Sequence, residues 1–208
     1  MDTGCSVYIV DSDAKVRQHL VKLLRRQHYK PTPFATGGDF VEALGFLAPG
    51  ISVIDLRLCD RDGMDVLWET HAKRLDIIPI VTAAGADIRT AVQAIKGGAE
   101  DFLEKPIEDE VIIQVLARFA PELNSKINLY AERFDAAKKL STLSEKELNV
   151  MVSLLRDRDN GKVAEHFRIS VRTVEAYRTR IMKKIGVKRF SDVLLLLSDS
   201  AAFRDNIS

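Results

Sequence analysis

The chain has 208 residues, of which 46% are hydrophobic and 29% are charged, and its formal net charge is +1. This balance is typical of a folded globular protein and excludes a disordered chain. No run approaches the roughly twenty apolar residues of a membrane helix, and the N-terminus lacks the basic flank and apolar core of a signal peptide. We therefore expect a cytoplasmic protein of two domains that does not bind a membrane.

The charge is divided unevenly along the chain. Residues 1–120 contain 14 Lys/Arg and 18 Asp/Glu, whereas residues 121–208 contain 17 and 12, so the two halves carry −4 and +5. Within 160–190 there are nine basic and two acidic residues. Such a cluster indicates either a polyanionic partner for the second half or simply a solvated helix face.

The first half alternates short apolar runs with segments of helical spacing. The runs that predict strands are 6–11, 31–34, 51–55, 79–83 and 101–105. Five βα units in series predict a parallel sheet with helices on both faces and right-handed crossovers, a doubly wound α/β domain.

Charged residues gather where these strands end. Asp11 and Asp13 follow the first run, Asp55 ends the third, and Lys105 ends the fifth. The carboxyl ends of parallel strands meet at one edge of a sheet, so these side chains are expected to lie together. Clustered carboxylates require a cation, and Mg²⁺ prefers such hard oxygen ligands. The alternative is that each aspartate only caps a helix.

Three motifs now identify a family. IVDSD (9–13), VIDLRLCDRDG (53–63) and GGAEDFLEKP (97–106) resemble the receiver domain of two-component response regulators of the FixJ/NarL type. The resemblance implies a five-stranded flavodoxin/CheY-like fold in which Asp55 accepts a phosphoryl group from a sensor histidine kinase. It also implies that Lys105 pairs with the phosphoryl oxygens and that Asp11 and Asp55 hold Mg²⁺. Asp13, one residue beyond the family's second acid, is a further candidate ligand.

Two departures from the receiver pattern concern function. The second of two adjacent acids after the first strand, a direct metal ligand in the family, is replaced by Ser12, so Mg²⁺ binding is expected to be weak or absent. Counting back from Lys105 places the family's switch hydroxyl at Ala83, while Thr82 should point to the opposite face. Phe102 occupies the aromatic switch position. We therefore weigh ordinary phosphoryl switching against a phosphorylation-independent regulator whose receiver serves as a dimerisation or partner-binding module.

From residue 141 the pattern predicts helices alone. Ser144 and Glu147 form a capping box before LNVMVSLL, GKVAEHF predicts a second helix, and VRTVEAYRTRIMKKIGV predicts a third that ends at Gly186. We expect a receiver at 1–120, a helical linker at 121–140 and a four-helix DNA-binding domain at 141–208.

The third helix has an apolar face backed by a largely cationic one. LSEKE, NGKVAEHFRIS and RTVEAYRTRIMKKIGV resemble the LuxR-type helix-turn-helix output domain, which binds double-stranded DNA. The resemblance implies a DNA-binding set made of Lys162, Ser170, Arg172, Thr173, Glu175, Ala176, Arg178, Thr179 and Lys183.

The last segment, 191–200, predicts a fourth helix with four consecutive leucines. Leucines all round a helix leave one side for the domain and another for a partner. We expect a homodimer on DNA, formed through Val193, Leu194, Leu196 and Leu197, and burial against the receiver is the alternative.

Enzymes of related architecture are the remaining alternative. A flavodoxin-like cofactor binder would need a neutral anion loop where the chain has VDSDA. A Mg²⁺-dependent, dehalogenase-like phosphatase matches Asp11-Ser12-Asp13 by spacing, but it explains neither Asp55 nor the helix-turn-helix. We expect a transcriptional regulator and not an enzyme.

Overall fold

The strands form where branched apolar residues follow one another, because a strand covered on both faces needs no polar side. The computed structural model describes residues 4–197. Its strands are β1 (Ser6–Val10), β2 (Lys30–Phe34), β3 (Gly50–Asp55), β4 (Ile77–Ala84) and β5 (Asp101–Lys105). They form one parallel sheet in the order β2-β1-β3-β4-β5, so the predicted doubly wound fold is confirmed.

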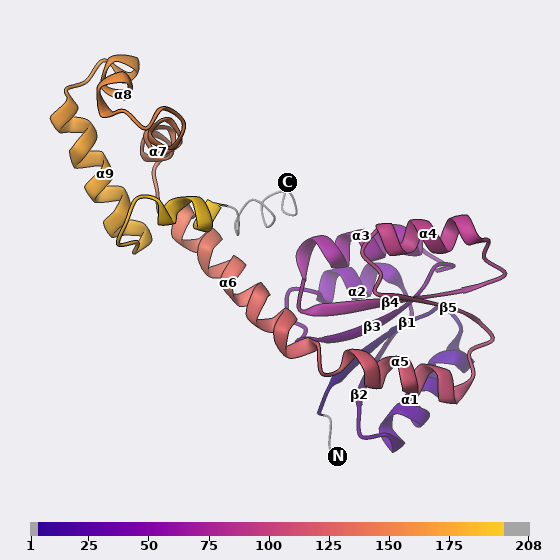
Figure 1. Ribbon diagram of the computed structural model, residues 1–208. Helices are drawn as coiled ribbons and strands as arrows, with labels where there is room; N and C mark the ends of the chain where they lie inside the picture. Colours follow the sequence, from indigo (N-terminus) through magenta and orange to yellow (C-terminus); the bar gives the residue numbers. More distant parts are fainter. Residues whose placement is uncertain (1–3, 198–208) are drawn as a thin grey trace. The chain divides into compact units, whose positions relative to one another are not determined.

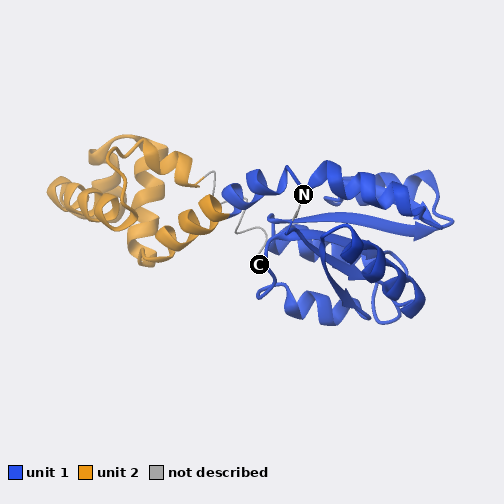
Figure 2. Cartoon of the chain, turned by 90° about the horizontal axis from the view of Figure 1, so that it is seen from below, with its two compact units in different colours: residues 1–130 blue, residues 131–208 orange. Residues whose placement is uncertain are grey.

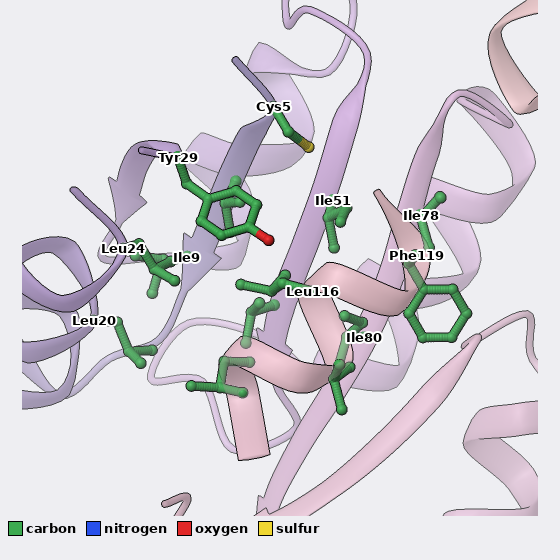
Figure 3. Close-up of a cluster of buried hydrophobic side chains, with 14 of the residues drawn as sticks. Cys5, Ile9, Leu20, Leu24, Tyr29, Ile51, Ile78, Ile80, Leu116 and Phe119 are labelled. Atoms are coloured by element: carbon green, nitrogen blue, oxygen red, sulfur yellow. The ribbon is translucent and has the colours of Figure 1, made fainter. Parts of the chain in front are cut away.

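Helices cover both faces of this sheet (Figure 1). Those that follow the strands are α1 (Ala14–Arg26), α2 (Gly37–Ala43), α3 (Gly63–Lys73), α4 (Ile88–Lys96) and α5 (Asp109–Phe119). α1 and α5 pack on one face through residues such as Leu24 and Leu116, which contact Ile9, Ile51 and Ile80 of the sheet (Figure 3). The other face is covered by α2, α3 and α4.

The second half of the chain is helical. It contains α7 (Glu145–Asp157), α8 (Asn160–Phe167) and α9 (Val171–Ile185), and residues 192–197 are also helical. The remainder of the expected fourth helix, 198–200, lies outside the described residues. A separate core joins these helices through Val150, Leu154, Val174 and Ile181.

The chain divides into two compact units, residues 1–130 and 131–208 (Figure 2). The division falls within α6 (Leu123–Ser141), which occupies most of the segment expected to link the domains. Leu123 packs in the core of the first unit and Leu140 in the core of the second. Over the residues described, no helix is long and apolar enough to cross a membrane.

Candidate functional site

The acidic site lies at the carboxyl edge of the sheet. Asp11 directly follows β1, Asp55 is the last residue of β3, and Lys105 is the last residue of β5. The Lys105 ammonium lies 2.6 Å from Asp11 Oδ2 and 2.8 Å from Asp55 Oδ2, and both aspartates are buried. Burial alone would lower the pKa of Lys105, but hydrogen bonds to Asp11 and Asp55 outweigh it and raise that pKa. The expected gathering of these three residues is therefore what the structure contains.

The loop after Asp55 is held against the sheet by a close approach that requires glycine. A Cβ atom on Gly63 would lie 2.3 Å from the Asp55 carbonyl oxygen. The Gly63 N–H donates to the Leu56 carbonyl at 3.1 Å, and α3 starts there with Asp62 as its N-cap. Asp55 is thus fixed at a tight turn between a buried strand and a helix.

Asp13 does not join the site in this structure, contrary to its expected place among the metal ligands. Its carboxylate caps α1 by accepting the Lys15 backbone N–H at 2.7 Å, and it is exposed. Its own N–H donates to Asp11 Oδ1 at 2.8 Å. The physical reason is that the open N-terminus of α1 offers this carboxylate an unpaired donor within the same loop.

The donor set for Mg²⁺ is therefore small. Between residues 4 and 197, no three Asp, Glu, His or Cys residues are arranged to hold a metal ion. Asp11 and Asp55 remain as two neighbouring carboxylates, a set that Mg²⁺ accepts when waters complete its coordination. The site thus fits Mg²⁺ with two carboxylate ligands. The ion would have to compete with the Lys105 ammonium, which contacts both carboxylates.

The positions of the family's switch residues lie on two faces of the sheet. Thr82 pairs in register with Asp55 and continues the face of Ile80. Ala83 lies on the opposite face, the one on which half-buried Phe102 packs. Ala83 has no hydroxyl to offer a phosphoryl group, and Thr82 is directed away from the Phe102 side.

A cavity of about 520 Å³ opens beside Lys105, a feature that the sequence patterns did not reveal. Its lining is mostly apolar and comes from α1 and from the segment that follows β5. The lining residues are Lys15, Val16, His19, Leu20, Ala84, Lys105, Pro106 and Ile107. In the sequence, only the apolar pair Pro106 and Ile107 after Lys105 could have indicated this cavity, because it belongs to no predicted strand or helix.

The second candidate site is the exposed face of α9. Arg172, Glu175, Ala176, Thr179 and Lys183 are all exposed, whereas Val174, Ile181 and Ile185 are buried in the core. The helix starts at Ser170, whose hydroxyl accepts the Thr173 N–H at 3.1 Å. Ser170 and Thr173 are therefore engaged in capping, while Lys162 is exposed on α8.

Arg178 has a different environment from the other cations of the set. Its guanidinium lies 5.0 Å from the centre of the Phe190 ring, and both residues line a cavity of about 350 Å³ with Arg158 and Leu194. Arg178 therefore packs beside the last helical segment as well as carrying charge.

The expected dimer surface changes in one respect. Val193 is completely buried in the core of the second unit, so it is unavailable to a partner as the structure stands. Leu196 and Leu197 are half-buried against that core, while Leu194 and Leu195 are 49% and 68% exposed. Consecutive leucines point in all directions around a helix, and the side that meets the core cannot be chosen from the leucines alone.

Comparison with known proteins identifies the family of each domain. Residues 7–117 match the family described as response regulator receiver domain, and residues 141–197 match the family of bacterial regulatory proteins called the luxR family. The chain is a response regulator with a LuxR-type output domain. It is therefore a two-component, DNA-binding transcriptional regulator.

Several relatives of this response regulator share its full architecture. It is 30% identical over 205 residues to the transcriptional regulatory protein FixJ of Bradyrhizobium diazoefficiens, covering 99% of this chain and 100% of that one. FixJ of Rhizobium meliloti is 32% identical over 186 residues, with 89% and 91% covered. The crystal structure of full-length FixJ from B. japonicum is 29% identical, with a TM-score of 0.55 over 95% of this chain and 97% of that one.

Proposed function

We propose that Asp55 is the phosphoacceptor of this regulator and that its phosphorylation controls the pairing of two output domains on DNA. The observation that carries the proposal is the contact of Lys105 with Asp55 at 2.8 Å and with Asp11 at 2.6 Å, on a buried edge of the sheet. An ammonium fixed at this place would also meet the oxygens of a phosphoryl group on Asp55.

The chemistry follows from these positions. An Asp55 carboxylate oxygen would attack phosphorus as the bond to the donor histidine of a sensor kinase breaks, giving an acyl phosphate. Lys105 would then turn from the two carboxylates to the new phosphoryl oxygens. Asp11 and Asp55 would hold Mg²⁺, which when bound supplies positive charge against the transferred group.

Coupling of this event to the rest of the receiver is expected to be modest. A shift of a two-state equilibrium from 1:99 to 99:1 requires about 5.5 kcal/mol, and one charge-assisted hydrogen bond supplies only about 1.5–3 kcal/mol. Ala83 removes the hydroxyl that would make such a bond. For this reason a phosphorylation-independent regulator, in which the receiver serves as a dimerisation or partner-binding module, is the second candidate.

On DNA, we expect α9 to enter the major groove. Glu175, Ala176 and Thr179 would face the bases, and Lys162, Arg172 and Lys183 would hold phosphates. Arg178 would contact the backbone from its place beside Phe190. The exposed Leu194 and Leu195 would form the contact between two copies of the output domain. The two-fold symmetry of that dimer would then match inverted half-sites in the DNA.

The domain limits fit this division of work. A receiver at 1–120 would supply the switch, a linker at 121–140 would carry its state, and an output domain at 141–208 would bind DNA. The phosphatase alternative loses support because Asp13, the second acid of its motif, caps α1.

The test is DNA affinity before and after treatment with a small phosphodonor and Mg²⁺. DNA fragments selected from a random pool by the full-length protein provide the probe. Tighter binding and dimer formation in the native chain, but not in Asp55→Asn, would support the proposal. Equal affinity and equal dimerisation in both proteins would favour the second candidate.

A further inference from the structure

Ser12 occupies the position at which receivers have their second acid, and its half-buried hydroxyl makes two contacts in different loops. It accepts the backbone N–H of Cys59 at 2.8 Å and donates to the carbonyl of Ala35 at 3.4 Å. An ionised carboxylate has no hydrogen to donate, so an aspartate at this position could make only the first contact. The hydroxyl therefore joins the loop after β3 to the turn after β2.

A second residue ties the same two loops together. The Asp60 carboxylate accepts the backbone N–H groups of Gly37 and Gly38 at 3.0 and 2.8 Å. The turn after β2 is also closely packed against the loop after β3, because a Cβ atom on Gly37 would lie 2.9 Å from Leu58 Cδ1 and 3.0 Å from Arg61 Cγ. Ser12 and Asp60 thus both tie the loop after β3 to the turn after β2.

The negative charge next to Asp55 is also partly offset by the chain itself. Lys105 contacts both Asp11 and Asp55, so the two carboxylates have a cation without any metal. In a site with three carboxylates, one ammonium would leave two negative charges uncompensated, and these would require a divalent ion. With serine at position 12, that need is reduced.

We infer that Ser12 is a positioning residue that orders the phosphoacceptor loop, residues 56–62, without a divalent cation. The hydroxyl holds this loop by its hydrogen bonds, so the order of the loop does not depend on a bound metal ion. A bound Mg²⁺ would add little order to a loop that is already tied to Ser12 and Asp60. The inference rests on the proposed function only for the name of the loop.

The test is amide hydrogen exchange of the full-length protein, with and without Mg²⁺, in the native chain and in Ser12→Ala, Ser12→Thr and Ser12→Asp. In the native chain, protection of the 56–62 segment should be the same with and without Mg²⁺. Ser12→Ala should speed exchange there by about tenfold, the size of effect that loss of one or two ordinary hydrogen bonds produces. Ser12→Thr keeps a hydroxyl and should restore protection.

Ser12→Asp is the decisive comparison. Its third carboxylate should make protection of 56–62 depend on Mg²⁺ and should lower the Mg²⁺ dissociation constant by at least about tenfold, because affinity follows the charge of the ligands. Thr90→Ala is the control, since its hydroxyl bonds Asp87 at the start of α4, and it should leave the segment unchanged.

Two results would overturn the inference. One is a native loop that becomes protected only when Mg²⁺ is added, and the other is a Ser12→Ala protein whose segment exchanges like the native one. If Ser12→Ala does not fold, Ser12→Thr and Ser12→Asp give the same comparison. No phosphodonor is used, so a failure of Asp55 to accept phosphate would leave this result standing, and the reverse also holds.

Discussion

Lys184 in α9 and Glu147 in α7 form an ion pair at 2.6 Å across the output domain, and only 4% of the Glu147 side chain is exposed. Glu147 also accepts the backbone N–H of Ser144 at 2.8 Å, which completes a capping box at the start of α7. The pair thus joins the helix that is expected to read DNA to the first helix of the domain.

Glu147→Gln should therefore destabilise the output domain. The amide can still accept from Ser144, but the charged bond to Lys184 is lost, and a hydrogen bond to a charged group contributes about 1.5–3 kcal/mol. Denaturant unfolding of the full chain, followed by far-UV circular dichroism, measures the loss. Glu145→Gln on the exposed first turn is the control and should change stability by less than about 0.5 kcal/mol. Equal effects of the two substitutions would contradict the structural role of the pair.

The same carboxylate predicts a pH dependence. The hydrogen bond from Lys184, followed by that from the Ser144 N–H, lowers the pKa of Glu147 from 4.5 to about 2 against the opposing effect of burial. Because the folded-state pKa is the lower one, the stabilisation is complete above about pH 4.5 and is lost as the pH falls toward about 2. The stability difference between the native chain and Glu147→Gln should shrink over that interval. A difference that stays constant down to pH 2 would count against it.

Removal of Lys105 should leave two buried carboxylates without a cation. Loss of one partner from a buried ion pair costs about 3–5 kcal/mol, so Lys105→Ala should unfold at a clearly lower temperature than the native chain. Mg²⁺ should recover part of this loss in the variant and have little effect on the native protein. Lys15→Ala is the control, because Lys15 is exposed and lines the same cavity as Lys105. If Mg²⁺ does not change the unfolding temperature of Lys105→Ala, Asp11 and Asp55 do not bind the ion.

The exposed face of α9 predicts two kinds of DNA-binding defect. Arg172→Ala should weaken binding to all sequences and reduce the slope of log affinity against log salt by about one unit, because one phosphate contact is lost. Glu175→Gln should instead change which bases are preferred. Arg25→Ala, on the exposed surface of α1, should alter neither property. An Arg172→Ala protein with the native salt slope would remove this residue from the phosphate contacts.

Two substitutions in the last helical segment, residues 192–197, should affect dimerisation and folding separately. Leu194→Glu places a charge on a residue that is 49% exposed and should weaken dimer formation on DNA with little loss of stability. Val193→Ala removes two buried methyl groups and should cost about 2 kcal/mol in unfolding free energy. Sedimentation of the protein with DNA and denaturant unfolding distinguish the two. A Leu194→Glu protein that still forms the native dimer would place the interface elsewhere.

The sheet and the acidic edge could be predicted from the sequence because both depend on local patterns. A run such as 51–55 is apolar throughout, so its strand and its end at Asp55 follow from burial on both faces. Once five βα units are recognised, parallel order brings Asp11, Asp55 and Lys105 to one edge. The capping box at Ser144 is equally local, since it spans four residues.

Contacts between distant loops could not be predicted in this way. Ser12 is 47 residues from Cys59 and 23 from Ala35 in the chain. The sequence showed only that an acid is absent at this position, and not which groups the hydroxyl contacts. Asp13 could serve as a ligand or as a cap, and the choice depends on how the loop leaves β1. Val193 was wrongly expected on the partner-facing side of its helix, because the four consecutive leucines that follow it do not show which side faces the core.

The most direct test of the account is intact-mass spectrometry after incubation with Mg²⁺ and a small phosphodonor. The native chain should gain the mass of one phosphoryl group, and Asp55→Asn should gain none. The absence of an adduct on the native chain, under conditions that phosphorylate an ordinary receiver, would contradict the account and leave a regulator that works without phosphorylation.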